Sequence, residues 1–518
     1  MLASSQLEMA TQQACAGLLL DAQHEFQELL KKTQTPSSLL LNNLAVVEAS
    51  LGNFESAQHL LAQAAELDPQ STSVTENRCY LERYSSNVEE GSFSGQTTIT
   101  SEDQRRRIAI VSLLFNWPST GGGTVHTKEL ADFLQHEGYE VRHFYAVNEQ
   151  WSVGNVRDDL PYPSTPIPFS EQDWNADSIR KRFHDEVTNF SPDAVIVTDS
   201  WNTKPLLCEA VADFPYFIRI AALESLCPLN NVRLLVDDQN QPQQCALNQL
   251  AEPTTCRNCV IQNQHLSGGL HQADRQLGGF FEADYPERLQ RAFAMAEGVL
   301  AVNPEIASLF EPHCKTAYVI PSGFDEQRFP AEAVSHPPQR EKKRLLFAGL
   351  TNELMKGFHV LQQAGELLWQ QRQDFEIVAT ADPVGQTNEF TRFIGWLSQA
   401  SLPEVIRDSD FLVFPTIAQE ALGRTAVEAM GCGRPVIASD IGGLSWVVEH
   451  GVTGLLCEAG NPHDLAAKCS QLLDAHSSRI QFGINGRKKF ERDFTWKQII
   501  KKHYLQLFGT PVREAARV

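Results

Sequence analysis

Two consecutive series of strand and helix patterns constrain the fold of this chain more than any other feature. The first begins with the apolar run RIAIVSLLF (107–115), followed by the loop NWPSTGGGTVH and the helical pattern TKELADFLQHEGY. The second begins with RLLFAGL (344–350) and alternates in the same way as far as GLLCEA (454–459). Because this alternation is typical of a parallel, doubly wound sheet, we expect two Rossmann-like α/β domains that face a cleft.

The chain of 518 residues is too long for one hydrophobic core, so several segments are expected. The predicted segments are a helical region (1–85), a polar linker (86–105), an N-terminal Rossmann-like domain (106–325), a C-terminal one (326–495) and a final helix (496–518). We expect that final helix to pack back on the N-terminal domain.

The helical region contains LNNLAVVEASLGNFESAQHLLAQAAELDP (41–69), two helix patterns joined at residues 51–53. It resembles one tetratricopeptide repeat, with small residues where the helices meet and large ones in the seam: Ala45, Ala57, Ala64, Leu44, Phe54 and Leu61. One repeat cannot bury its own apolar face. The region is therefore either a docking module for a protein partner or a helical cap on the rest of the chain.

Composition excludes several classes of protein. There are 43 Lys and Arg residues against 64 Asp and Glu residues, a net charge of -21, which argues against a nucleic-acid surface. We find no run of about 18 apolar residues and no basic leader, so neither a transmembrane segment nor a signal peptide is expected. The 11 cysteines are mostly scattered, which favours reduced thiols in the cytoplasm.

The most informative stretch is QEALGRTAVEAMGCGRPVIASDIGGL, which directly follows the strand pattern DFLVFPT (410–416). Gly423 is expected to open a helix whose free N–H groups suit a phosphate, with the Thr425 hydroxyl beside it. Glu420 precedes the helix and Glu428 lies within it, so two carboxylates can accept hydroxyl groups on either side of that phosphate.

The two spaced glutamates and the following EAMGCGRPVIASDIGG resemble the donor site of retaining glycosyltransferases of family four, which have the two-domain GT-B fold. VIPSGFDEQRF (319–329) and LLFAGLTNELMKGFHVL (345–361) resemble further motifs of that family, in the same order. The resemblance covers about residues 107 to 500 and is strongest after 319.

This resemblance implies roles for particular residues. Glu428 would bind the ribose of a nucleotide-diphosphate sugar, while Glu420 would lie by the transferred sugar and Lys356 would neutralise the diphosphate. The remaining donor-binding positions would be Gly349, Gly395, Trp396, Gly423, Arg424 and Thr425. Leu350 stands where the family has an arginine, so Arg424 is the alternative second cation. No metal is expected for catalysis, because lysine and a helix dipole stabilise the leaving group.

The acceptor side is less distinctive. The loop Gly121, Gly122 and Gly123 follows a strand and opens a helix, so it either approaches a ligand closely or forms a tight turn. Where many relatives have a histidine, this chain has Glu224, a candidate acceptor-side acid.

Four cysteines lie in an insert expected at 227–259: Cys227, Cys245, Cys256 and Cys259. Their pattern fits a structural zinc site, while a disulfide or free thiols are the alternatives.

The sequence therefore predicts a retaining glycosyltransferase that transfers a sugar to a glycan, a lipid-linked molecule or another acceptor, as in polysaccharide biosynthesis. The alternatives are a nucleotide-sugar epimerase of the same fold and a catalytically silent binding protein that acts through its tetratricopeptide-like region.

Overall fold

We describe the protein from a computed structural model. The residues it describes are 7, 19–33, 35–50, 54–69, 71, 74, 78, 106–119, 121–236, 242–330, 340–381, 388–395, 397 and 401–511. The predicted linker (86–105) and Trp396 lie outside these residues. The chain divides into two compact units, Met1–Glu102 and Asp103–Val518, which we describe separately.

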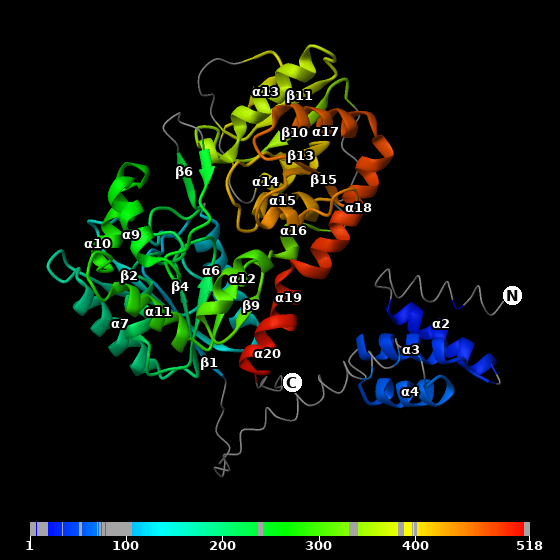
Figure 1. The fold of residues 1–518 in the computed structure, drawn as a ribbon, viewed down its shortest axis with the longest axis horizontal. Helices are drawn as coiled ribbons and strands as arrows, with labels where there is room; N and C mark the ends of the chain where they lie inside the picture. The colour runs from blue at the N-terminus through cyan, green and yellow to red at the C-terminus, as the bar shows by residue number, and fades with distance from the viewer. Residues whose placement is uncertain are drawn as a thin grey trace, which may run out of the picture. The chain divides into compact units, whose positions relative to one another are not determined.

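The first unit contains three described helices, α2 (Leu19–Lys32), α3 (Ser38–Ser50) and α4 (Phe54–Leu67) (Figure 1). Helices α3 and α4 pack against each other, as the sequence pattern predicts. The residues in their shared core include Leu41, Leu44, Ala45, Ala57, Leu61 and Ala64, all of them fully or almost fully buried.

The second unit begins with a seven-stranded sheet in the order β3-β2-β1-β4-β5-β8-β9, whose strand pairs are all parallel. Its strands are β1 (Arg107–Ser112), β2 (Glu140–Val147), β3 (Ser164–Pro168), β4 (Ala194–Thr198), β5 (Tyr216–Ile220), β8 (Gly298–Ala301) and β9 (Ala317–Val319). The α-helices of this domain are α6 (Gly122–Glu137), α7 (Ala176–Phe190), α8 (Lys204–Ala210), α9 (Pro253–Gln262), α10 (Gly269–Leu277), α11 (Tyr285–Met295) and α12 (Pro304–Phe310). A small hairpin, β6 (Leu234–Val236) and β7 (Pro242–Gln244), lies within the Cys-containing insert.

A second parallel sheet follows in the order β12-β11-β10-β13-β14-β15. Its strands are β10 (Lys343–Phe347), β11 (Phe375–Ala379), β12 (Thr391–Phe393), β13 (Phe411–Phe414), β14 (Val436–Ser439) and β15 (Gly454–Cys457). Its helical segments are η5 (Leu354–Lys356), α13 (Phe358–Trp369), α14 (Leu402–Arg407), α15 (Arg424–Gly431), α16 (Gly443–Val447), α17 (Pro462–Asp474) and α18 (His476–Asp493). In both sheets the first strand lies in the middle and the order reverses beside it, which is the doubly wound arrangement that the sequence predicts.

The end of the chain returns to the N-terminal sheet (Figure 1). After α18, the segments α19 (Trp496–Ile499), η6 (Ile500–Tyr504) and α20 (Leu505–Phe508) share one apolar core with strand β1. Trp496 and Tyr504 are fully buried there, together with Ile108 and Ile110. The segment that follows α18 therefore packs on the N-terminal sheet, so that one continuous stretch of chain connects the two sheets of the second unit.

Candidate donor and acceptor sites

Lys356 is the last residue of the short 3-10 helix η5, which lies in the loop between β10 and α13 at the carboxyl edge of the C-terminal sheet. The loop follows β10 and packs on the loop that follows the neighbouring strand β13. The backbone N–H of Ile417 and the hydroxyl of Thr416 both donate to the carbonyl oxygen of Met355, at 2.9 and 2.8 Å. Two adjacent strand ends therefore fix the position of Lys356, at the edge where parallel sheets bind ligands.

Lys356 forms an ion pair with Glu420. The Nζ–Oε2 distance is 3.2 Å, and the two side chains are 29% and 23% exposed. The negative charge of Glu420 raises the pKa of Lys356, although burial opposes this effect. Lys356 is therefore cationic at neutral pH, and the two residues that the sequence assigns to catalysis are in direct contact.

The loop that carries Glu420 also contacts the N-terminal domain. The backbone N–H of Gly443 donates to the carbonyl oxygen of Glu420 at 2.7 Å. The side-chain amide of Asn303, which caps α12 in the N-terminal domain, donates to the carbonyl oxygen of Ala421. The position of Glu420 thus depends on both domains.

Helix α15 begins at Arg424, with Gly423 as its N-cap at a φ of 73°. This agrees with the expected helix start. No side-chain hydrogen bond caps the helix, so within the described part of the chain its first N–H groups are not taken by a capping side chain. Those groups and the helix dipole favour an anion next to the Lys356–Glu420 pair.

Glu428, the predicted ribose-binding residue, is more enclosed than expected. Its side chain is 2% exposed, and its Oε1 atom accepts a hydrogen bond from Nη2 of Arg328 at 3.3 Å. Burial raises the pKa of Glu428, while the nearby charges of Arg424 and Arg328 lower it. A bound ribose would therefore share this carboxylate with Arg328.

Arg424 contacts a carboxylate of the N-terminal domain. Its Nη2 atom lies 3.3 Å from Oε2 of Glu129, which is on α6 and is also 3.1 Å from the indole nitrogen of Trp496. The side chain of Arg424 also lies against Gly122, where an added Cβ would be 3.2 Å from its Cδ atom. The loop that contains Gly122 and the first residue of α15 therefore meet at Arg424.

On the acceptor side, Gly121 is the N-cap of α6, and Gly122 and Gly123 form the first turn of that helix. Glu224 differs from the expectation of a ligand-facing acid. Its two carboxylate oxygens accept the backbone N–H groups of Ala221 and Ala222, at 2.7 and 2.6 Å. The carboxylate of Glu224 therefore stabilises the turn in which it lies, because the N–H groups that follow β5 need an acceptor.

Two of the other predicted positions are glycines that follow strands. Gly349 follows β10, and Gly395 follows β12 with a φ of 76° and a backbone N–H bonded to the carbonyl of Ala381 at 3.2 Å. Leu350, at the position of the family arginine, is 38% exposed. The role of Trp396 stays a prediction.

The structure does not assemble the predicted zinc site. Within the described part of the chain, no group of three or more His, Cys, Asp or Glu residues is placed to hold a metal ion. The four insert cysteines are all free thiols, so a disulfide between them is also absent. They do lie within electrostatic range of one another: burial and the other three thiols raise the pKa of Cys256 to about 12.

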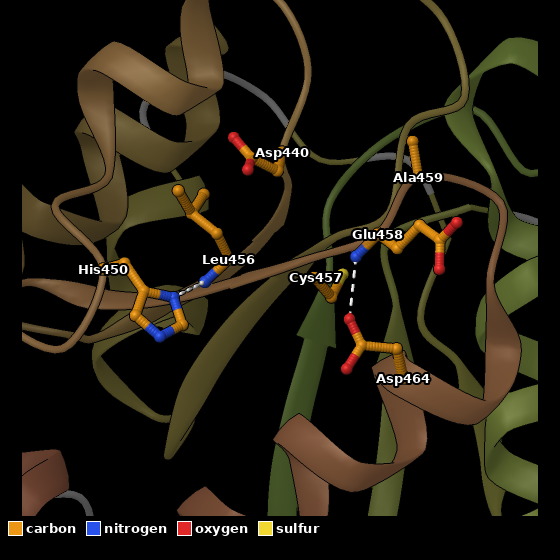
Figure 2. Close-up of a pocket in the computed structure, with 7 residues that line it drawn as sticks. All are labelled: Asp440, His450, Leu456, Cys457, Glu458, Ala459 and Asp464. Carbon is orange, nitrogen blue, oxygen red and sulfur yellow. Dashed lines mark hydrogen bonds between the residues drawn. The ribbon is translucent and has the colours of Figure 1, made fainter.

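A separate pocket opens at the carboxyl ends of β14 and β15 (Figure 2). Its lining residues are Asp440, His450, Leu456, Cys457, Glu458, Ala459 and Asp464. The N–H groups of Leu456 and Glu458 donate to His450 and Asp464, at 3.0 and 2.8 Å. Three acids would repel a diphosphate, and the lining includes none of the donor residues predicted from the sequence.

Three residues at the domain contact were not found by sequence reasoning: Glu129, Asn303 and Arg328. They come from α6, the end of β8 and η3 (Glu326–Arg328), far from the motif around Glu420. Two signals were available in the sequence: Asn303 lies two residues after the strand β8, where parallel sheets place functional side chains, and Arg328 lies within the segment 319–329.

Residues 342–475 match the family model described as glycosyl transferases group 1. A D-inositol 3-phosphate glycosyltransferase of Pseudarthrobacter chlorophenolicus is 33% identical over 156 residues, which cover 27% of this chain and 36% of that protein. A glycogen synthase of Mycobacterium tuberculosis is 28% identical over 210 residues, 38% of this chain and 50% of that protein. The chain spans half the length or less of these curated relatives.

Solved structures match over a larger part of the chain. Anabaena HepE, solved with UDP and glucose, matches with a TM-score of 0.52 and 16% identity, covering 78% of this chain and 99% of that one. Sucrose-phosphate synthase of Thermosynechococcus elongatus matches with a TM-score of 0.53 and 17% identity, at 78% and 99% coverage. The prediction of a GT-B fold is confirmed. No helix in the described part of the chain is long and apolar enough to cross a membrane.

Proposed function

We propose that this protein is a retaining glycosyltransferase that takes a sugar from a nucleotide-diphosphate donor and transfers it to a hydroxyl-bearing acceptor. The observation that carries the proposal is the Lys356–Glu420 ion pair, which lies at two strand ends inside the segment that matches group 1 glycosyl transferases. The uncapped start of α15 lies in the same segment, directly after Glu420.

In the proposed mechanism, each group has a separate task. The first N–H groups of α15 and the cation of Lys356 bind the diphosphate and stabilise its charge as the bond between the anomeric carbon and the diphosphate oxygen breaks. The acceptor oxygen bonds to the anomeric carbon on the face that the diphosphate leaves, and a diphosphate oxygen takes the proton of the acceptor hydroxyl. Glu420 holds Lys356 in place and accepts hydroxyl groups of the transferred sugar. Glu428 accepts the ribose hydroxyls. The site thus works through position and charge, and its residues supply no covalent nucleophile.

A product assay tests this proposal. UDP-, GDP- and ADP-sugars are screened by thermal shift, and the donor that stabilises the protein is incubated with sugar acceptors. Proton NMR should show a released nucleoside diphosphate and a new glycosidic bond with the anomeric configuration of the donor. A product inverted at C2 of the sugar would instead identify an epimerase, and an inverted anomeric centre would contradict the retaining mechanism.

One observation favours a catalytically silent binding protein as the second candidate. Leu350 replaces the arginine that the family resemblance leads us to expect, and Arg424 is paired with Glu129. A silent protein would bind the nucleotide sugar without releasing nucleoside diphosphate in the same assay. The tetratricopeptide-like helices would then act as a docking module, with exposed apolar residues such as Leu39 and Leu67 on α3 and α4.

We also propose that zinc binding would draw the four insert cysteines together into a structural site, which they do not form in this structure. The proximity of the four thiols supports this. Burial and the neighbouring thiols raise the pKa of Cys227 and Cys256, and metal binding would displace the protons of these thiols. Elemental analysis of the purified protein should find about one zinc per chain, and none in a Cys256→Ser/Cys259→Ser variant. Metal-free wild-type protein would contradict the proposal.

The free thiols of the described cysteines also support a cytoplasmic location for the protein.

A further inference from the structure

Asp199 occupies the point of the N-terminal sheet where the strand order reverses. It directly follows β4, whose neighbours in the sheet are β1 and β5. From β1 the chain continues to β2 on one side of the sheet, and from β4 it continues to β5 on the other side. The strand order therefore reverses between β1 and β4. Open α/β sheets bind ligands in the crevice at such a position. The backbone carbonyl of Asp199 also accepts the N–H of Leu114 at 2.9 Å, which holds the chain beyond β1 against this residue.

The local geometry of Asp199 is unusual. Its φ is 41°, in the left-handed region that residues other than glycine seldom occupy, and such strain is found mainly at functional sites. The carboxylate lies against the first turn of α6: a Cβ atom added to Gly123 would be 3.4 Å from Oδ1 of Asp199. The absence of a side chain at Gly123 therefore leaves room beside the carboxylate.

The carboxylate of Asp199 has an oxygen without a partner, unlike its neighbour Glu224. Its Oδ2 atom is buried and has no hydrogen-bond partner among the described residues. The hydroxyl groups of Ser200 and Ser225, each 1% exposed, are likewise unpartnered in that part of the chain. Both carboxylate oxygens of Glu224, by contrast, accept backbone N–H groups of the same turn. Buried polar groups normally have partners, so each of these three groups lacks a hydrogen bond that a ligand could supply.

We propose that Asp199 binds a hydroxyl group of the sugar acceptor, and that the acceptor therefore presents a polyhydroxylated ring at the strand-order reversal of the N-terminal sheet. An ionised carboxylate has only acceptor atoms, so a hydroxyl donor complements it, whereas an anionic group would be repelled. Ser200, the next residue along the chain, can donate to or accept from a further hydroxyl of the same ring. This inference rests on the proposed function and specifies its acceptor class.

The pKa of Asp199 provides a second way to test whether this residue binds the acceptor. Burial raises the pKa of Asp199 to about 6, while Thr127 on α6, Lys204 on α8 and Ser112 at the end of β1 oppose the increase and Glu224 adds to it. The phenol of Tyr162 also lies within electrostatic range of this carboxyl group. Acceptor binding should therefore strengthen as the pH rises through about 6 and the carboxylate ionises.

The test compares wild-type protein with Asp199→Asn, which keeps the shape of the side chain, and with Asp177→Asn as a control at a side chain that is 91% exposed. Saturation-transfer NMR measures binding of three uncharged probes, glucose, mannose and myo-inositol, in the presence of UDP. We expect Asp199→Asn to weaken probe binding about tenfold or more and to abolish its pH dependence. The control should bind like wild-type protein.

Separate measurements distinguish this inference from the proposed function. Affinity for the nucleotide sugar and its hydrolysis without acceptor should be unchanged in Asp199→Asn. Folding is checked at pH 8, where the variant should unfold at an equal or higher temperature, because it lacks the buried negative charge. Equal probe binding by the variant and wild type, or no probe binding by wild type, would overturn the inference. Failure of wild-type protein to bind any nucleotide sugar would overturn the proposed function instead.

Discussion

Replacing Lys356 with methionine is expected to lower kcat for sugar transfer by about 10²–10³-fold, the loss seen when a preorganised charge-stabilising group is removed. Lys356 is held by Glu420 at 3.2 Å at the edge of the sheet. The variant keeps most of the side-chain volume but has no charge for the leaving diphosphate. Initial rates with the donor found by screening measure the effect.

Lys468→Met is the matched control for this variant. Lys468 lies in the same domain, is paired with Asp464 at 3.8 Å, and has a side-chain exposure of 26% against 29% for Lys356. The control should retain wild-type kcat, and both variants should unfold within a few degrees of wild type. Full activity in Lys356→Met would remove this residue from the mechanism.

Gly357→Ala should destabilise the protein by about 3 kcal/mol or more and abolish transfer. Gly357 has a φ of 69°, and an added Cβ would be 1.8 Å from the carbonyl oxygen of Pro415. This is the contact between the two loops that place Lys356. The methyl group can be accommodated only if these loops separate, which moves the cation away from Glu420. Denaturant unfolding and initial rates measure the two effects.

Gly451→Ala separates backbone strain from the loss of loop contact. Gly451 has nearly the same φ, 74°, but an added Cβ would have no atom within 4 Å. This control should lose about 1–2 kcal/mol of stability and keep its activity. Equal losses of stability in the two variants would show that loop packing at Gly357 contributes little.

The two sheets and the helix start at Gly423 could be predicted because they depend on local patterns. Short apolar strands, helical periodicity and a glycine at a helix N-cap leave their signal within a few residues. The motif that contains Glu420 is similarly local, since its loop and helix are continuous in the sequence. The contact between Lys356 and Glu420 follows from the adjacency of β10 and β13.

The partners of the site residues could not be predicted, because they are distant in the sequence. Arg328 is 100 residues from Glu428, and Arg424 is 295 residues from Glu129. Whether a carboxylate is free to bind a ligand also depends on its contacts in the folded chain. The sequence predicts Glu224 as an acceptor-side acid, but neighbouring backbone N–H groups donate to both of its oxygens. Asp199 ends the strand pattern PDAVIVTDS, and only the order of the folded strands shows why that position differs from other strand ends.

Calorimetric titration of the selected nucleotide sugar into wild-type protein and Glu428→Gln tests the central claim most directly. The claim is that the C-terminal domain binds a nucleotide sugar through α15 and the residues around it. Wild-type protein should bind one donor per chain, and the variant should bind at least about tenfold more weakly, because the amide is a poorer acceptor for the ribose hydroxyls. Equal affinity in both proteins, or no binding of any nucleotide sugar to the wild type, would contradict the account.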